Sequence, residues 1–320
     1  MQYRHISVML EEIIEALNLE KGDHIVDCTL GGAGYTVAIA GKIGEEGRVL
    51  SIDLDKLAIE NARKLIEEKK INNITLVNDS FRHVGEIAKE NFGERKADGI
   101  VFDLGLSSAQ LDDAARGFSF KIDAPLNMSF GDEIQGEATE KIVNYRREEE
   151  LTKIFREYGE ERFASRIAKG IVQYRKSAGI RTTGQLVEII KSAIPKRFQS
   201  GDIHPATRTF QALRIAVNDE LAQVEQALPI WIDQLYPGGR LAVISFHSLE
   251  DRLVKNAFSE HSIGYEADLK LLTKKPAIAG HEEIVLNPRA RSARLRAAVK
   301  INKTEGSLNA NSSKKYFPGI

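Results

Sequence analysis

The sequence has a single cysteine, no long hydrophobic run and almost no net charge, and each of these absences excludes a class of protein. Among 320 residues the one cysteine, Cys28, excludes an internal disulfide framework, and no Cys/His cluster has the spacing of a zinc site. No segment approaches the roughly 18 apolar residues of a membrane span, and the first residues do not resemble a signal peptide. We therefore expect a cytoplasmic protein that holds no metal and does not enter a membrane.

The near-zero net charge argues against a wholly basic nucleic-acid binder, but the cationic residues are unevenly distributed. The chain carries 45 Lys+Arg and 46 Asp+Glu, whereas residues 141–214 alone hold 16 Lys+Arg against 8 Asp+Glu. A second basic segment, residues 288–300, contains several arginines and no acidic residue. Such asymmetry is typical of a surface that faces phosphates, although solvated helix faces balanced by acids elsewhere would produce the same counts.

The chain does contain a glycine-rich corner at residues 25–36, with the sequence IVDCTLGGAGYT. An apolar run, a cluster of glycines and a helix-compatible run predict a strand, a tight loop and a helix. Gly31, Gly32 and Gly34 allow positive φ and leave no Cβ in the way, so the backbone can approach a nucleotide-like ligand. A second strand over 48–52 leads to Asp53, an acid placed to accept the hydroxyls of an adenosine ribose.

This corner does not match the dinucleotide fingerprint G-x-G-x-x-G, because no glycine lies three positions after Gly34. An acid at the end of the first strand, Asp27, followed by a G-x-x-G loop is instead similar to the opening motif of S-adenosylmethionine-dependent methyltransferases. A dinucleotide site and a glycine-rich turn without a ligand are the alternatives that this stretch leaves open.

Strand and helix patterns alternate along the N-terminal third of the chain, which predicts a doubly wound parallel sheet. An amphipathic helix over 7–17 precedes the glycine-rich corner. The pattern then predicts helices over 57–68 and 84–90 and strands over 74–77 and 99–103, the last of which ends on Asp103.

After Asp103 the alternation stops. Residues 104–140 are loop-like, and helices are predicted over 142–158, 161–175, 183–193 and 205–220. A strand pattern returns at 239–246, after a Pro-Gly-Gly turn. We therefore expect a discontinuous α/β domain over 1–107 and 213–301, an inserted helical domain over 108–212, and a disordered tail over 302–320.

Several longer segments carry a resemblance to one family. They are 103–113 (DLGLSSAQLDD), 116–120 (RGFSF), 158–164 (YGEERFA), 204–211 (HPATRTFQ), 244–252 (ISFHSLEDR) and 287–292 (NPRARS). With these segments in this order, the chain resembles the bacterial 16S ribosomal RNA cytosine-N(4) methyltransferases, the RsmH or MraW family, over residues 5–300. The resemblance implies a Rossmann-like class I S-adenosylmethionine-dependent methyltransferase sheet with an inserted all-helical domain for substrate recognition. The implied reaction is methylation of the exocyclic amine N(4) of a cytidine in the decoding region of the small ribosomal subunit.

Carried over by position, the resemblance also implies site residues. The implied cofactor contacts are Ala33, Gly34, Tyr35, Asp53, Phe81, Asp103 and Gln110. The catalytic candidates are Asp103, Ser107, Ser108 and His247. Asp103 and the residues up to Ser108 would supply hydrogen-bond acceptors for the target amine, and His247 would help to hold the target nucleotide. His247 could instead cap a helix whose first turn contains Ser248 and Glu250.

The sequence departs from the family pattern in two places. Ala33-Gly34-Tyr35 stands where the family usually has Gly-Gly-His. The family's Pro-Leu-Asp-Met-Arg is here Pro-Leu-Asn-Met-Ser, with Asn127 and Ser129 at the positions of the acid and the base. Loss of both charges preserves the local charge balance if the pair is structural, and weakens or retargets activity if the pair orients the cytosine.

The resemblance implies S-adenosylmethionine as methyl donor, no required metal, and 16S rRNA of the small ribosomal subunit as partner. A monomer and a dimer are both compatible with the sequence. The basic insert and the arginines of 288–300 would face RNA phosphates. Two alternatives stay open: a methyltransferase of the same fold with a non-RNA acceptor, and a non-catalytic RNA-binding or ribosome-assembly factor that retains the fold.

Overall fold

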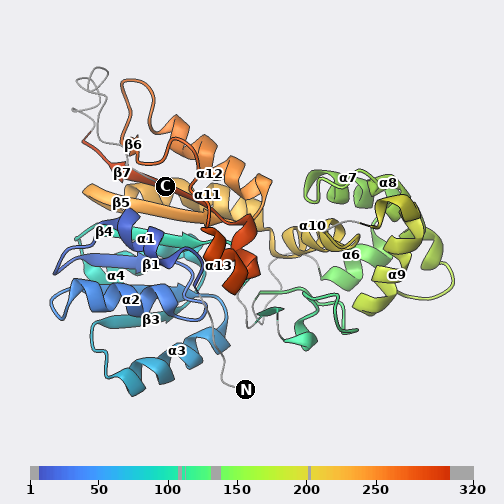
Figure 1. The fold of residues 1–320 in the computed structure, drawn as a ribbon, viewed down its shortest axis with the longest axis horizontal. Helices are drawn as coiled ribbons and strands as arrows, with labels where there is room; N and C mark the ends of the chain where they lie inside the picture. Colours follow the sequence, from blue (N-terminus) through green and yellow to red (C-terminus); the bar gives the residue numbers. More distant parts are fainter. Residues whose placement is uncertain (1–6, 107–109, 112, 131–137, 201–202, 303–320) are drawn as a thin grey trace. The chain divides into compact units, whose positions relative to one another are not determined.

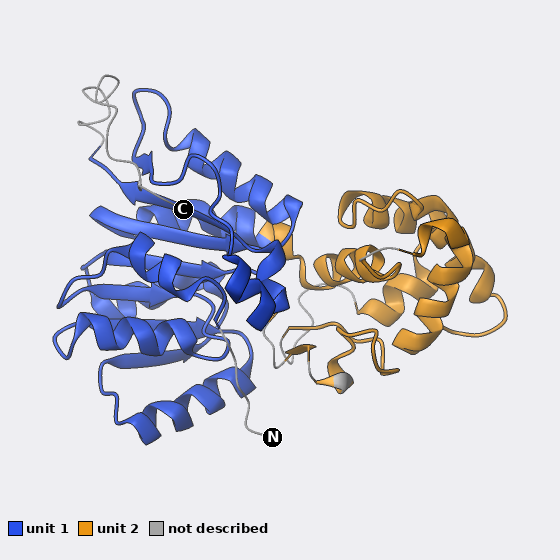
Figure 2. Ribbon diagram, viewed as in Figure 1, with its two compact units in different colours: residues 1–105, 223–320 blue, residues 106–222 orange. Residues whose placement is uncertain are grey.

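The computed structural model of the chain describes residues 7–106, 110–111, 113–130, 138–200 and 203–302. The chain divides into two compact units, residues 1–105 with 223–320 and residues 106–222 (Figure 2). The second unit contains the whole segment 108–212 that the sequence predicts as an insert, and it extends into the first turn of helix α11 (Glu220–Asp233). From residue 303 onward, the tail predicted to be disordered lies outside the described residues.

The first unit is built on a seven-stranded sheet with the order β3-β2-β1-β4-β5-β7-β6 (Figure 1). The strands are β1 (His24–Asp27), β2 (Arg48–Asp53), β3 (Ile74–Asn78), β4 (Ala97–Asp103), β5 (Leu235–Ser245), β6 (Leu269–Leu271) and β7 (Arg294–Lys300). The first five are parallel, whereas β7 is antiparallel to both β5 and β6. The predicted Rossmann-like α/β sheet is confirmed. Among its described strands β7 alone runs opposite to the others, a reversal that the alternating pattern of the N-terminal third does not predict.

The charges of β7 explain why its pattern did not predict a strand. Arg296 lies in the middle of β7 and is only 8% exposed, because its guanidinium is paired with the carboxylate of Asp251. The Nε and Nη2 atoms donate to the two carboxylate oxygens at 2.7 and 3.1 Å. Arg296 is therefore part of the fold and not a free cation for RNA phosphates, which corrects that part of the expectation for residues 288–300.

Helices pack on both faces of the sheet. In chain order they are α1 (Leu10–Leu17), α2 (Gly34–Ile43), α3 (Lys56–Lys69), α4 (Val84–Phe92), α11, α12 (Ser248–Glu260) and α13 (His281–Leu286), with short 3-10 turns η1 (Phe81–His83) and η4 (Pro288–Ser292). Alternate residues of β4 enter two different cores: Ile100 and Phe102 one, and Val101 the other. This is the burial expected of a strand covered on both faces. No helix of the described part of the chain is long and apolar enough to cross a membrane.

The elements described in the second unit are α-helices and short 3-10 turns. Its elements are η2 (Ala114–Arg116), α6 (Thr139–Tyr145), α7 (Glu148–Glu157), α8 (Ala164–Tyr174), α9 (Thr183–Ala193), η3 (Lys196–Phe198) and α10 (Thr207–Asn218). Their apolar faces share one core, in which Phe155, Ile167 and Leu186 are fully buried. The unit therefore has a core of its own.

The single helix predicted over 142–158 is wrong, because the chain breaks between α6 and α7. Arg146 and Arg147 adopt extended backbone conformations. The backbone N–H of Arg147 donates to the Glu150 carboxylate at 2.9 Å, so an acid three residues into α7 caps its start. Hydrophobic periodicity continues across such a break, and it therefore did not reveal a second helix start.

Candidate active site

A buried hydrogen-bond network supports the glycine-rich corner where β1 ends. The carboxylate of Asp27 accepts from the Thr36 hydroxyl at 2.6 Å and from the Thr29 backbone N–H at 3.1 Å. Thr36 is also 2.8 Å from the hydroxyl of Ser51 on β2. Burial raises the pKa of Asp27 to about 6, although these hydrogen bonds oppose the shift. The network ties β1, β2 and the first turn of α2 together beneath the loop.

The loop itself turns sharply before α2. Gly31 has φ +47° and Ala33 has φ +61°, a left-handed conformation that costs a residue with a Cβ about 1 kcal/mol. Gly34 opens α2, and a Cβ built on it would lie 1.8 Å from the hydroxyl oxygen of Ser7. The close approach of Ser7 is therefore the reason that this position requires glycine.

Asp53 ends β2 beside this loop, as the sequence pattern predicts. Its carboxylate accepts the backbone N–H of Gly31 at 2.8 Å through one oxygen and that of Asp55 at 2.8 Å through the other. Burial raises the pKa of Asp53 to about 6, and the two backbone hydrogen bonds oppose this rise. Each oxygen keeps a further lone pair, so the carboxylate is fixed in place and can still accept ligand hydroxyls.

Asp103 ends β4 next to β1 in the sheet. Its backbone N–H donates to the Thr29 hydroxyl at 2.7 Å, and its Oδ1 atom is buried without a hydrogen-bond partner among the described residues. Burial raises the pKa of Asp103 to about 8; the Arg289 cation opposes this rise, and the charges of Asp27 and Glu250 add to it. An unpartnered buried carboxyl oxygen is rare in proteins and is typical of a ligand site.

Tyr35 and Phe81 are packed more deeply than a simple ligand contact requires. Tyr35 is 2% exposed, and its hydroxyl donates to the carbonyl of Val8. Burial raises the pKa of Tyr35 well above its usual value, and the nearby charge of Asp103 adds to the effect. The Phe81 ring meets that of Phe102 edge-on, with centroids 4.7 Å apart. Both side chains therefore pack into the cores of the first unit, and their contact with the cofactor stays a prediction.

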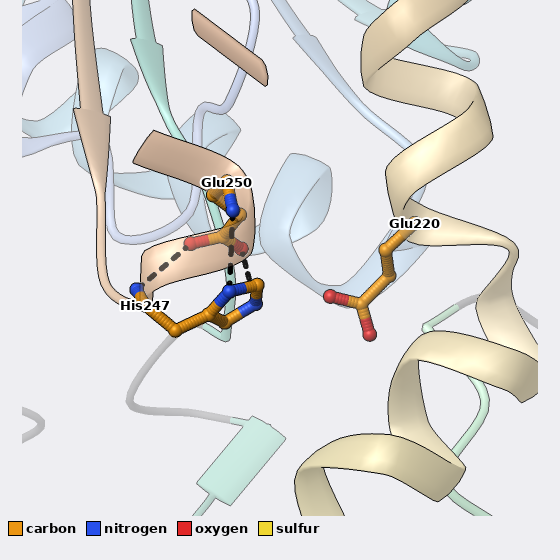
Figure 3. A group of neighbouring side chains, drawn as sticks. All are labelled: Glu220, His247 and Glu250. Atoms are coloured by element: carbon orange, nitrogen blue, oxygen red, sulfur yellow. Dashed lines mark hydrogen bonds and ion pairs between the residues drawn. The ribbon is translucent and has the colours of Figure 1, made fainter. Parts of the chain in front are cut away.

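His247 is the N-cap of α12 (Figure 3). Its Nδ1 atom accepts the backbone N–H of Glu250 at 3.3 Å, and the Glu250 carboxylate accepts the backbone N–H groups of Phe246 and His247 at 2.8 and 3.3 Å. The His247 Nε2 atom lies 3.1 Å from Glu250 Oε1, without hydrogen-bond geometry. The structure thus shows the capping role that the sequence left open, and a role of His247 toward the target nucleotide stays a prediction.

The remaining site candidates lie in the second unit or outside the described residues. Gln110 is 7% exposed and belongs to the second unit. Ser107 and Ser108 are not among the described residues. Glu220, which Figure 3 also draws, accepts both Nε and Nη2 of Arg214 at 2.8 Å within the second unit. The site that the described residues define is therefore the strand-end site of the first unit.

Sequence reasoning missed three contributors to this site. Thr36 and Ser51 follow no motif that predicts a buried network, and only the contacts of the Thr36 hydroxyl with Asp27 and with Ser51 show their role. Arg289 was assigned to a phosphate-facing cluster, whereas its charge acts on Asp103. The residues are far apart in sequence, so no local pattern could have connected them.

Comparison with other proteins shows the family of this chain. The sequence matches the family described as the MraW methylase family over residues 2–301. A protein from Brevibacillus brevis named ribosomal RNA small subunit methyltransferase H is 45% identical over 94% of this chain and 99% of its own length. A protein of the same name from Heliobacterium modesticaldum is 46% identical over 94% of this chain and 100% of its own.

Solved structures include an rRNA methylase from Streptococcus thermophilus that aligns over 94% of this chain and 99% of its own, with a TM-score of 0.42 and 11% identity. The family match covers nearly the whole described chain, both units included, and the two relatives match over almost their full length. The chain therefore belongs to the MraW methylase family.

Proposed function

We propose that this chain transfers a methyl group from S-adenosylmethionine to the exocyclic N4 amine of a cytidine in the decoding region of 16S rRNA. Family membership and relatives named ribosomal RNA small subunit methyltransferase H support the reaction class and the RNA. The assignment of the methyl group to N4 of a cytidine in the decoding region rests on the motif resemblance. The proposal places the chain in the cytoplasm with the small ribosomal subunit as its partner.

The observation that carries the proposal is the Oδ1 atom of Asp103 at the carboxyl end of the sheet, which is buried and has no hydrogen-bond partner among the residues that the structure describes. A buried carboxyl oxygen with no donor suits the α-ammonium group of S-adenosylmethionine, which would supply a charge-assisted hydrogen bond. Asp53, fixed by two backbone N–H groups, suits the ribose hydroxyls. The backbone of the loop at Gly34 and the ring of Phe81 would complete the cofactor site. The residues present therefore fit this cofactor.

When bound, S-adenosylmethionine supplies an electrophilic methyl group on a sulfonium. The chain's own residues must position the target amine about 3 Å from that carbon and keep water out. A cytosine amine is a weak nucleophile because its lone pair is delocalised, so acceptors must bind its hydrogens as the nitrogen becomes tetrahedral. Asp103 and the segment that follows it would provide them. Leu104 is held there by its backbone N–H, which donates to the Ile244 carbonyl at 2.9 Å.

The departure at Asn127 and Ser129 bears directly on this proposal. Asn127 is exposed, and its side-chain oxygen accepts the backbone N–H of Ser129 at 3.4 Å. The side-chain amide of Asn218 holds the same turn. Its Nδ2 atom donates to the Met128 carbonyl at 2.7 Å, and its Oδ1 atom accepts the Phe130 N–H at 2.9 Å. The segment keeps a defined turn without the acid and base, so the turn in this chain does not depend on a charged pair at these positions.

Transfer of labelled methyl from S-adenosylmethionine to small ribosomal subunits and to free 16S rRNA, followed by nucleoside analysis, tests the proposal. We expect labelled N(4)-methylcytidine, lost in Asp103→Ala and retained in Asn127→Asp, which keeps the turn acceptor. Label in another nucleoside or in protein would overturn the assigned acceptor. Cofactor binding without transfer to either substrate would favour a non-catalytic RNA-binding factor.

A further inference from the structure

A row of cationic side chains runs along α8 of the second unit. Arg166 and Lys169 are three positions apart and share one face of this helix, and Arg162 lies in the turn just before it. All three are exposed. None of them takes part in an ion pair among the residues that the structure describes, so their charges are open to an external partner.

This row borders a groove of about 580 Å³ between α8 and α9, which pack together within the second unit (Figure 1). Gly170, Ile189 and Ala193 line its apolar floor. A Cβ on Gly170 would lie 3.3 Å from the Ile189 side chain, so glycine lets the two helices approach closely there. Among the residues that line the groove, the only acidic one is Glu188. Its Oε1 atom pairs with Lys191 Nζ at 3.2 Å.

An aromatic cluster stands beside the first cation of this row. The rings of Phe163 and Phe198 have centroids 5.3 Å apart, and the Arg162 guanidinium lies 4.7 and 4.1 Å from them. Arg197 lies 4.8 Å from the Phe198 ring, which is 39% exposed. Because Gln199 donates to the Lys191 and Ile194 carbonyls at 2.7 and 2.6 Å, the short turn that presents Phe198 is held in place.

These features combine the requirements of one ligand class. Unpaired cations on one helix face suit a chain of phosphates. The partly exposed Phe198 ring and the two guanidinium groups that lie over it form a planar cluster on which an unpaired base can stack. An acidic peptide would use the cations but not the ring. A duplex would use the phosphate contacts but keep its bases stacked and out of reach.

We propose that the α8–α9 groove binds a single-stranded segment of RNA, with phosphates at Arg166 and Lys169 and an unstacked base at Phe198. This site lies wholly within the second unit, and its place in substrate binding rests on the proposed function. It would hold RNA flanking the target cytidine and so add affinity for the substrate without contact with the reacting base.

Equilibrium binding of a short fluorescein-labelled oligouridylate to the full chain tests the site. We expect Phe198→Ala to weaken binding about tenfold and Phe198→Trp, which keeps a ring, to retain it. Replacing Arg166 and Lys169 together by glutamine removes two phosphate contacts, so the slope of log affinity against log salt should become shallower by about 1.4. The matched controls are Tyr145→Ala, an aromatic that is 78% exposed on α6, and Arg147→Gln, whose guanidinium already pairs with Glu150. Both controls should bind like the parent.

Unchanged binding in Phe198→Ala and in the Arg166/Lys169 variant would overturn the inference, as would equal loss in the controls. Equal affinity for duplex RNA would contradict the assignment of a single strand and favour a duplex as the ligand. Complete competition by polyglutamate would favour an acidic chain instead. Methyl transfer to small subunits, measured in the same proteins, separates the two proposals. A parent that binds oligouridylate but transfers no methyl group contradicts only the function, whereas a parent that methylates subunits but does not bind it contradicts only the groove.

Discussion

The backbone N–H of Asp103 donates to the hydroxyl of Thr29, so the end of β4 is anchored to the loop that follows β1. Thr29 is itself positioned by Asp27, whose carboxylate accepts the Thr29 N–H at 3.1 Å. Two neighbouring strand ends are therefore joined by a continuous chain of hydrogen bonds. This series of hydrogen bonds fixes the position of the Asp103 carboxyl group.

Thr29→Val should show how far the position of Asp103 matters, because it removes the hydrogen bond that holds Asp103 and leaves the Asp103 carboxyl group in place. Valine has the shape of threonine but no acceptor, so the Asp103 N–H loses its partner, and we expect a loss of about 1–2 kcal/mol in the free energy of unfolding. Affinity for S-adenosylmethionine should fall with it. Urea unfolding and cofactor titration measure the two effects. Thr29→Ser keeps the hydroxyl and serves as the control; an equal loss there would contradict the hydrogen-bond argument.

Stability should fall as the pH rises from weakly acidic to weakly alkaline. Burial raises the folded-state pKa of Asp27 and Asp53 to about 6 and that of Asp103 to about 8. The folded protein therefore keeps protons that the unfolded chain, with carboxyl pKa values near ~4, has already released. The stabilisation is complete below the unfolded value and is lost as the pH passes through about 6 and then about 8.

Urea midpoints measured at several values between about pH 5 and pH 8.5 check this expectation. Asp103→Asn cannot ionise, so its stability should decline less above about pH 6.5, by at least ~1 kcal/mol relative to the parent. Parallel curves for parent and variant would show that Asp103 does not titrate in this range.

The sequence could predict the parts of this protein that depend on local pattern. The strand ends at Asp53 and Asp103 and the turn at Gly34 follow from apolar runs and glycines close to them in the chain. The α6–α7 break escaped prediction because it depends on one side chain, Glu150, capping a backbone group inside an unbroken hydrophobic pattern.

What the sequence could not predict depends on contacts between distant segments. The charge of Arg289 acts on Asp103, and Thr36 reaches Asp27 and Ser51, through the folded sheet alone. The sequence pattern did not predict β7, because a buried arginine cannot be told from an exposed one by sequence. Only the folded structure places Asp251 beside Arg296.

Gly34→Ala and Gly41→Ala form a matched pair on one helix. The new Cβ at position 34 would overlap the Ser7 hydroxyl, whereas at position 41 no atom lies within 4 Å. We expect Gly34→Ala to lower the free energy of unfolding by about 1 kcal/mol or more and to weaken cofactor binding. Gly41→Ala should raise stability by roughly 0.5–1 kcal/mol, as expected for an exposed helical site.

Adding Ser7→Ala to Gly34→Ala removes the oxygen that the new methyl group meets. Ser7 Oγ is buried without a hydrogen-bond partner among the described residues, so its loss should carry little cost of its own. Thermal unfolding of the double variant should recover most of the loss. Failure to recover would show that the cost at position 34 comes from the backbone and not from Ser7.

Asp251 lies on α12 and pairs with Arg296 of β7, and we expect Asp251→Asn to be strongly destabilising. Asp251 and Arg296 are 7% and 8% exposed, and Arg294 adds a third contact at 3.3 Å. Burial alone would raise the pKa of Asp251, but the hydrogen bonds and charge of Arg296 hold it below its usual value. Its stabilisation is therefore present above the unfolded pKa and is lost only as the pH falls through the lower folded value.

Removing one partner leaves a buried guanidinium without its counter-charge, which costs about 3 kcal/mol or more. Urea unfolding at neutral pH measures that loss, and the double variant Asp251→Leu with Arg296→Met should lose less than Asp251→Asn, because an apolar pair leaves no unpaired buried charge. The exposed pair of Glu188 and Lys191 is the control: Glu188→Gln should change stability by no more than about 0.5 kcal/mol. If Asp251→Asn unfolds at the midpoint of the parent, β7 is held by its backbone ladder and apolar residues, and the buried ion pair adds nothing to them.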